Sequence, residues 1–443
     1  MSIEPRLAST RLRLFSAILA GAAFPALAAC PPDTFADLAD FSHADSVVAQ
    51  SEDRFAEAIA TNGQFMAAGL SQQAHSTTEA GEVYLYRRGA APNQWQYLKR
   101  IDEPGFSEVG DNFGGALAMD GDTLVVGAIQ AGDVPSNDAG AVHVFERNLG
   151  GTDAWGPRQS IIAQESAGYV SFGVSVALDR NRLLVGDRDA DSGTGKVVIY
   201  ERSGVGANFT EVKSLVSPPT DVDRDHFGDY VAVYGDTVIV SDPLYDVDPV
   251  SSGLEGRVYV YDRNQGGPGQ WGLVTRIDAP AGITAFGSAI SLWKDRLAIA
   301  SLGGAGRVHL HERNQGGSGA WGPVVEVDAG GDSISGGEFG KAIHLHENEL
   351  LVGASAVAGI TGATGAAYVF QRDVGGAGNW GRTQKLFSGS NNNRSNFGAS
   401  LDYDQGFAVI GDPLSDHPSF APGSRIGRAY VYLDDLIFCT PFE

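Results

Sequence analysis

The chain has few of the residues and motifs on which catalysis commonly depends. Its only two cysteines, Cys30 and Cys439, lie near its two ends, which argues against a thiol nucleophile. No Gly-x-Ser-x-Gly elbow, His-Glu-x-x-His helix or Walker-type loop occurs. The 31 basic residues against 54 acidic ones, a net charge of −23, argue against a nucleic-acid partner. After the N-terminal apolar run Leu14–Ala29, no apolar stretch approaches the ~18 residues of a membrane span.

What the chain does contain is a repeat. Seven phenylalanines are separated by 53 to 59 residues, and a small residue follows each of them 14 residues later. They are Phe55, Phe113, Phe172, Phe227, Phe286, Phe339 and Phe397. The seven blocks align without a gap, and a period of this size predicts an array of equal modules.

Each module is predicted to contain four short antiparallel strands. In the second copy, Phe113–Met119 alternates large and small residues, as a strand with two different faces does. Asp120-Gly121-Asp122 then predicts a tight hairpin. A third strand follows at Ala141–Phe145, and a fourth comes after Trp155. Because such a sheet must bury its faces against neighbours, the repeats predict an all-β, seven-bladed β-propeller.

The two ends of the chain are predicted to close the ring. The seventh module stops after its third strand, Ala429–Leu433, and the missing strand is expected at Ser46–Ala49, before the first repeat. Antiparallel pairing of these segments would bring Cys30 and Cys439 to one edge. We therefore predict a Cys30–Cys439 disulfide, worth about 5–6 kcal/mol in the chain-entropy formula.

The first 29 residues have the pattern of a signal peptide. Arginines precede an apolar run, Leu14–Ala29, which contains an Ala26-Leu27-Ala28 cleavage site. We expect residues 1–29 to be removed and residues 30–443 to form a single propeller domain, exported to the extracellular space or periplasm. Leu27–Cys30 also resembles a bacterial lipobox, so an envelope lipoprotein anchored at Cys30 is the alternative.

Acidic residues gather in the loops after the second and fourth strands, which share one face of a propeller. They are Asp133, Asp138, Asp187, Asp189, Asp191, Asp221, Asp223, Asp225, Asp242, Asp246, Asp248, Asp412 and Asp416. We predict an acidic loop face that binds a protein or glycan ligand. The alternative is a set of solvated turn carboxylates with no partner.

The Phe-Gly start, the Val-Gly-Ala end of the second strand and the Gly-x-Val-Tyr-Val-Tyr third strand resemble FG-GAP repeats. The resemblance runs from about Ser46 to Leu433. It implies a propeller like that of integrin α-subunits and of exported bacterial proteins. The calcium loop of integrin-type repeats lies between the first and second strands, where this chain has only a two- or three-residue turn. The metal residues of that family are therefore not carried over.

Two other stretches have carboxylates at alternate positions, as a calcium loop does. They are Asp187, Asp189 and Asp191, and Asp221, Asp223 and Asp225. Neither has the glycine at position 6 or the acid at position 12 of an EF-hand loop, so a bound Ca²⁺ at either is a hypothesis only. The paired histidines His309/His311 and His344/His346 lie on predicted strands, and the first pair stands where other copies have Tyr or Phe.

Three functions remain open on these observations. A rigid ring with variable loops and no catalytic motif favours a non-enzymatic binding or adhesion scaffold. A polysaccharide-acting hydrolase or lyase that uses loop aspartates is the enzymatic alternative. A structural module of an envelope assembly is the third.

Overall fold

The computed structural model describes residues 39–41, 54–71, 80–91, 94–105, 108, 110–131, 139–163, 171–218, 226–246, 254–358, 364–388, 395–416 and 426–433. The chain divides into a unit Met1–Thr34, which lies outside the described residues, and a unit Phe35–Glu443. The fold is that of the second unit.

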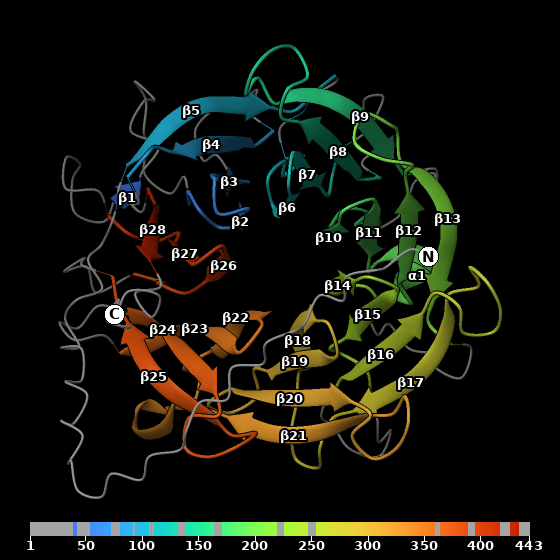
Figure 1. Ribbon diagram of the computed structural model, residues 1–443, viewed down its shortest axis with the longest axis vertical. Coiled ribbons are helices and arrows are strands. Elements are labelled where there is room, and N and C mark those ends of the chain that lie inside the picture. The colour runs from blue at the N-terminus through green and yellow to red at the C-terminus, as the bar shows by residue number, and fades with distance from the viewer. Residues whose placement is uncertain are drawn as a thin grey trace, which may run out of the picture. The chain divides into compact units, whose positions relative to one another are not determined.

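This unit is a ring of seven four-stranded antiparallel sheets, so the predicted seven-bladed β-propeller is confirmed (Figure 1). Blades 1 to 3 contain β2 (Ile59–Thr61), β3 (Phe65–Leu70), β4 (Glu82–Arg88) and β5 (Trp95–Asp102); β6 (Ala116–Asp120), β7 (Thr123–Ala128), β8 (Ala141–Glu146) and β9 (Gly156–Ile162); and β10 (Ser175–Asp179), β11 (Arg182–Asp187), β12 (Lys196–Glu201) and β13 (Thr210–Val216). Blades 4 and 5 contain β14 (Val231–Tyr234), β15 (Thr237–Asp242), β16 (Arg257–Asp262) and β17 (Gly272–Asp278); and β18 (Phe286–Trp293), β19 (Arg296–Ser301), β20 (Arg307–Arg313) and β21 (Trp321–Val327). Blades 6 and 7 contain β22 (Phe339–His346), β23 (Glu349–Ala358), β24 (Thr364–Arg372) and β25 (Trp380–Leu386); and β26 (Ser400–Asp404), β27 (Phe407–Asp412), β28 (Arg428–Leu433) and β1 (Ala39–Phe41).

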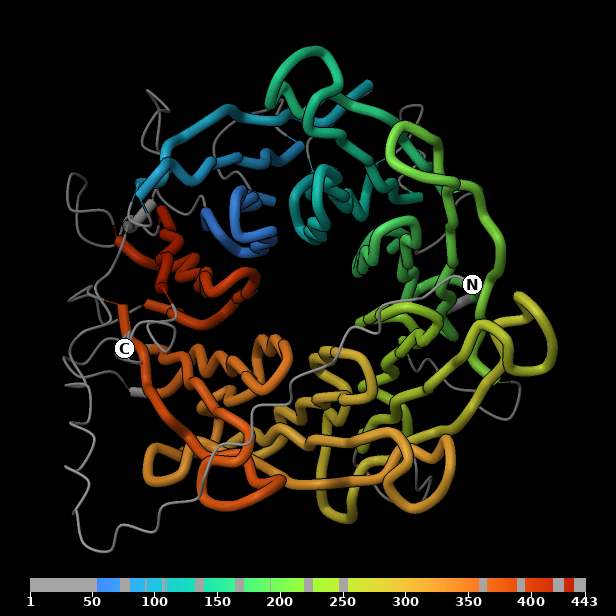
Figure 2. The backbone as a smooth tube through the Cα atoms, viewed as in Figure 1, coloured from blue at the N-terminus to red at the C-terminus, as the bar shows by residue number. Residues whose placement is uncertain are grey.

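The first strand of each blade lies nearest the common axis, and the fourth lies at the rim (Figures 1 and 2). Each innermost strand contacts the innermost strands of both neighbouring blades, and the contact of β2 with β26 completes the circle. Besides the strands, the described residues contain only one helical turn, α1 (Ala190–Gly193), and one 3₁₀ turn, Gly330–Asp332.

The ring is closed by an N-terminal strand, as predicted, but from a different segment. β1 pairs antiparallel with β28, with Ala39 opposite Val431 and Phe41 opposite Ala429. The predicted closing segment, Ser46–Ala49, lies outside the described residues. The closing strand lies at the rim, and the chain must run from there to Phe55 near the axis. Elsewhere the shortest connection of this kind runs from Asp278 to Phe286. A closing strand that ended at Ala49 would leave a shorter connection to Phe55 than this one.

Glycines allow the backbones of neighbouring blades to touch. A Cβ added to Gly127 would lie 2.2 Å from the carbonyl oxygen of Gly173 in the next blade. Gly140 has φ +87°, and a Cβ there would lie 2.3 Å from the carbonyl oxygen of Phe172. The same contacts recur around the ring, so the glycines of the repeat mark blade interfaces.

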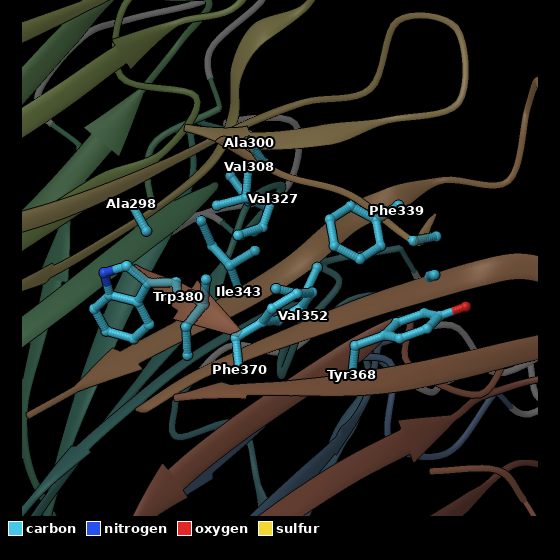
Figure 3. Packing of buried hydrophobic residues seen from close by; sticks show 14 of the residues in the cluster. Ala298, Ala300, Val308, Val327, Phe339, Ile343, Val352, Tyr368, Phe370 and Trp380 are labelled. Carbon is cyan, nitrogen blue, oxygen red and sulfur yellow. The ribbon is translucent and has the colours of Figure 1, made fainter. Parts of the chain in front are cut away.

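In six of the seven blades the repeated phenylalanine packs against an aromatic ring on the third strand, in a tilted or T-shaped contact. Figure 3 shows this contact in blade 6, where the centroid of Phe339 lies 5.4 Å from that of Tyr368 and 6.0 Å from that of Phe370. Phe339 is fully buried, and Trp380 belongs to the same cluster. The large face of the strand therefore fills the core between blades, as the alternation predicts.

A ladder of ion pairs also joins consecutive blades. In blades 2 to 5 an acidic residue lies at or next to the end of the third strand. It contacts an arginine at the corresponding end of the third strand in the next blade. The pairs are Glu146–Arg202 at 3.4 Å, Glu201–Arg263 at 3.1 Å, Asp262–Arg313 at 3.7 Å and Glu312–Arg372 at 3.5 Å. The first of these arginines is almost completely buried, so the ladder begins inside the protein.

Candidate functional site

Seven side chains surround the axis on the face that carries the turns between first and second strands. Each lies seven residues after the repeated phenylalanine. We call this set the mouth ring: Asn62, Asp120, Asp179, Tyr234, Trp293, His346 and Asp404. Blades 4 to 6 contribute rings, whereas blades 7 and 1 to 3 contribute carboxylates and an amide.

In the polar half, most side chains bind the backbone of the next blade. Asn62 Nδ2 donates to the carbonyl oxygen of Gly121 at 2.6 Å. A carboxylate oxygen of Asp120 accepts the amide hydrogen of Arg180, and Asp179 accepts that of Gly235 at 2.6 Å. These groups are therefore used to hold the blades in position.

In the other half, the rings contact one another across blade boundaries. The centroids of Tyr234 and Trp293 lie 5.1 Å apart in a T-shaped contact, and those of Trp293 and His346 lie 3.9 Å apart. His346 lies 5.5 Å from Tyr403 of blade 7, a ring that is buried. We call Tyr234, Trp293 and His346 the aromatic arc.

An imidazole–carboxylate pair lies beside the aromatic arc. His344 Nδ1 is 2.7 Å from Asp402 Oδ1, and Asp402 Oδ2 accepts the amide hydrogen of Thr61 across the closing seam at 2.7 Å. Burial, and to a smaller extent the nearby His344, lowers the pKa of His346. Burial raises the pKa of Asp404, the last residue of β26.

A cavity of about 310 Å³ lies next to the arc, between the turns of blades 5 and 6. It is lined by Trp293, Lys294, Asp295, Arg296, Glu347 and Asn348. Arg296 spans the two blades, since it donates to the Glu347 carbonyl oxygen and to Asn348 Oδ1 at 3.1 Å. The cavity thus has a fixed floor, one large ring and several polar side chains.

Two buried histidines make contacts that resemble a catalytic relay. His143 lies 3.2 Å from Glu103 Oε1 and 2.9 Å from the Ser160 hydroxyl. Burial lowers the pKa of His143 to about 4 and raises that of Glu103 to about 7. In blade 5, His309 similarly contacts Glu326 at 3.2 Å and Ser301 at 3.1 Å.

Repeat equivalence explains these contacts. His143 and His309 occupy the third-strand position of Tyr84 and Tyr368, and all four rings pack against the repeated phenylalanine of their own blade. The Tyr84 hydroxyl donates to Glu82 at 2.6 Å, and that of Tyr368 donates to Asp332 at 3.3 Å. An interior ring whose polar tip meets a carboxylate is therefore a structural feature of this fold.

Three of the aspartates predicted on an acidic loop face are instead buried. Asp187, Asp242 and Asp412 are each at most 1% exposed, at the ends of second strands. Asp412 accepts hydrogen bonds from the Asn396 amide at 2.8 Å and from the Ser395 hydroxyl. Burial raises the pKa of Asp412 to about 6. The prediction that these three line an exposed face is wrong, because all three are buried, and Asp187 and Asp412 anchor the loops that lead into their own blades.

The first predicted calcium stretch lies around α1. Asp187 accepts the Ser171 amide hydrogen at 3.0 Å, and Asp189 accepts the Ser171 hydroxyl hydrogen. Asp191 lies within α1. No group of three or more potential metal-binding side chains occurs among the described residues. A calcium site here stays a prediction, which calorimetric titration with Ca²⁺ would test.

Other predicted residues lie outside the described part of the chain. They are Asp133, Asp138, Asp221, Asp223, Asp225 and Asp248, the two cysteines Cys30 and Cys439, and the signal peptide, residues 1–29. Within the described ranges, no helix has the length and apolar character needed to cross a membrane.

The blades and their mouth ring define a β-propeller of seven equal repeats. Residues 107–145, in the second blade, match the family model of the FG-GAP repeat, and this match confirms the resemblance seen in the sequence. No curated protein sequence matches the chain.

Solved structures of similar fold include the periplasmic gluconolactonase of Pseudomonas aeruginosa. It is 17% identical, with a TM-score of 0.46, and the match covers 74% of this chain and 84% of that one. A protein from Lactobacillus plantarum is 13% identical, with a TM-score of 0.48 and coverage of 75% and 84%.

The mouth ring is the feature that the sequence analysis missed. The alignment of the repeats contained the signal, because the position seven residues after each phenylalanine changes from polar to aromatic in blades 4 to 6. Asp120 and His346 were named in the sequence analysis, but as a turn residue and a strand residue, and not as members of one repeated position.

Proposed function

We propose that the protein is an exported, non-enzymatic scaffold that binds an extracellular ligand at the mouth ring. The observation that carries this proposal is the division of the ring. Its polar half is used mainly in bonds between blades, whereas its aromatic arc borders a cavity with a rigid floor. A preorganised site of this kind favours binding, because little ordering of side chains is needed when a ligand arrives.

The enzymatic alternative has one specific observation in its favour. Asp404 has a raised pKa at the mouth, and Asp402 lies two residues away on the same face of β26. Glycoside hydrolysis commonly uses two carboxyl groups, one as the acid and one as the base or nucleophile. Asp402, however, already contacts His344 and the Thr61 amide, so its orientation is set by the seam between blades.

One experiment separates the two functions. Purified protein is incubated with envelope and extracellular polysaccharides, while bound ligand and newly formed reducing ends are both measured. Binding without new reducing ends supports the scaffold. Turnover that disappears in Asp404→Asn would instead establish a hydrolase.

Export is part of the same proposal. It is supported by the signal-peptide pattern of residues 1–29 and by the acidic composition of the chain. Intact mass of the mature protein would distinguish a freely secreted form, which starts near Cys30, from a lipid-modified form. Recovery of the unprocessed chain in the cytoplasm would contradict the proposal.

A further inference from the structure

Trp293 differs from the other tryptophans of this chain. Five of the six, Trp95, Trp155, Trp271, Trp321 and Trp380, are buried at or next to the start of a fourth strand. Trp293 is the last residue of an innermost strand, is partly exposed and lines the cavity. An aromatic ring that keeps exposed area in a concave site offers a flat apolar face to a ligand, and small-ligand sites are typically lined by such rings.

The neighbours of Trp293 hold its ring in place. Tyr234 and His346 contact it from the two adjacent blades, at 5.1 and 3.9 Å between centroids. On the ring itself lies the ammonium group of Lys294, 5.3 Å from the centroid, and this side chain is exposed. A flexible lysine can move aside, so a ligand can exchange places with it over the indole.

The rest of the cavity offers both donors and acceptors. Lys294 donates, Glu347 accepts and the Asn348 amide nitrogen donates, while Asn348 Oδ1 accepts from Arg296, and all three side chains are exposed. Asp295 is paired with Arg313 at 2.7 Å, and Arg296 with Glu312 at 3.3 Å, so these two belong to the framework. The volume of about 310 Å³ is at the lower end of the range for small-ligand sites.

We propose that this cavity binds one neutral pyranose unit of a glycan, stacked on the indole of Trp293. The inference rests on the proposed scaffold function and names its ligand class. An aromatic face matches the C–H face of a sugar ring, and mixed donors and acceptors match its hydroxyl groups. The lining holds two acidic and two basic side chains, so it presents no net positive charge to an acidic glycan, and the net charge of −23 disfavours one at longer range.

The test measures binding of neutral and acidic oligosaccharides to the full mature chain by calorimetry and by tryptophan fluorescence. Neutral hexose oligosaccharides should bind and quench fluorescence, with an affinity that hardly changes with salt. Trp293→Ala should weaken binding about tenfold or more, and Asn348→Ala should weaken it several-fold. Tyr97→Ala is the matched control, since Tyr97 is a 41% exposed ring on the rim strand β5; it should bind as the wild type does.

Several results would overturn the inference. They are a lack of binding of every neutral oligosaccharide, salt-sensitive binding of acidic ones only, or equal affinities of Trp293→Ala and wild type. Unchanged binding in Trp293→Ala would refute this site while leaving the scaffold function intact, whereas cleavage of the oligosaccharide would refute the scaffold function. Glu347→Ala should weaken binding several-fold and is decisive where Trp293→Ala does not fold, because Glu347 is an exposed turn residue that holds Arg296 through its backbone and not its side chain.

Discussion

Removal of the Arg202 guanidinium tests whether the ion-pair ladder stabilises the ring. The side chain of Arg202 is 1% exposed, and that of its partner Glu146 in the preceding blade is 9% exposed. Arg202 also donates to the Thr123 hydroxyl at 2.8 Å and to the Arg180 carbonyl oxygen at 3.1 Å. It lies 4.6 Å above the ring of Phe209. Two contacts with the preceding blade, to Glu146 and to Thr123, therefore converge on one buried cation.

The expected magnitude follows from burial. Arg202→Met keeps most of the apolar stem but takes from the buried Glu146 its closer cation, and the loss of a buried partner typically costs about 3–5 kcal/mol. The Gly206 amide still donates to Glu146 at 2.7 Å and Arg158 Nε stays 3.9 Å from it, so we expect the lower end of that range. Arg307→Met is the matched control. Arg307 and Glu326 are 2.9 Å apart but about half exposed, and such pairs contribute at most about 1 kcal/mol.

The assay is urea-induced unfolding at neutral pH, followed by circular dichroism. The double variant Arg202→Met/Glu146→Met should recover part of the loss, because it removes the unpaired carboxylate as well. The reasoning is refuted if Arg202→Met costs no more than Arg307→Met, or if the double variant is less stable than Arg202→Met alone.

Three further predictions concern other parts of the ring. Burial lowers the pKa of His311 to about 4, below an unfolded value of about 6.5, so its contribution to stability is lost as pH falls through this window. His311→Tyr should therefore remove up to about 2 kcal/mol of the difference in stability between pH 8 and pH 5, and an unchanged pH dependence would contradict this. Gly127→Ala should lower stability by about 1–3 kcal/mol through the clash between blades, whereas Gly331→Ala, where a Cβ meets nothing, should not; thermal unfolding compares them. Non-reducing peptide mapping should find Cys30 linked to Cys439, and two free thiols would exclude the bond.

The repeat made the architecture predictable because one residue has the same task in every blade. Phe113 and its six counterparts each fill the core between two blades, so their spacing revealed the number and size of the modules. The closing strand was predicted in the wrong segment, since Val47 and Val48 look more like a strand than Ala39–Phe41 does. The deciding constraint was the length of chain needed to reach Phe55 from the rim, which requires knowledge of the blade's width.

The prediction for the buried aspartates was wrong for a different reason. Asp187 and Asp412 each follow the small residue of the repeat directly, and an aspartate beside a polar loop is typical of a turn. In the structure they are the last residues of their strands, and their carboxylates accept hydrogen bonds inside the blade. Such a residue points into the protein when amide groups of the loop that leads into its blade need an acceptor. The position of that loop, and so the amides in question, is known only from the structure.

Equal blades also help to separate structure from function. A side chain that every copy needs for packing recurs around the ring in one chemical class, as the rings opposed to the repeated phenylalanine do in six of the seven blades. The mouth ring breaks this rule. Packing alone would allow a carboxylate in blades 4 to 6 as it does in blades 2 and 3, where Asp120 and Asp179 bind the next backbone. Tyr234, Trp293 and His346 forgo those bonds, and the adjacent cavity is where a compensating gain, a bound ligand, would be found.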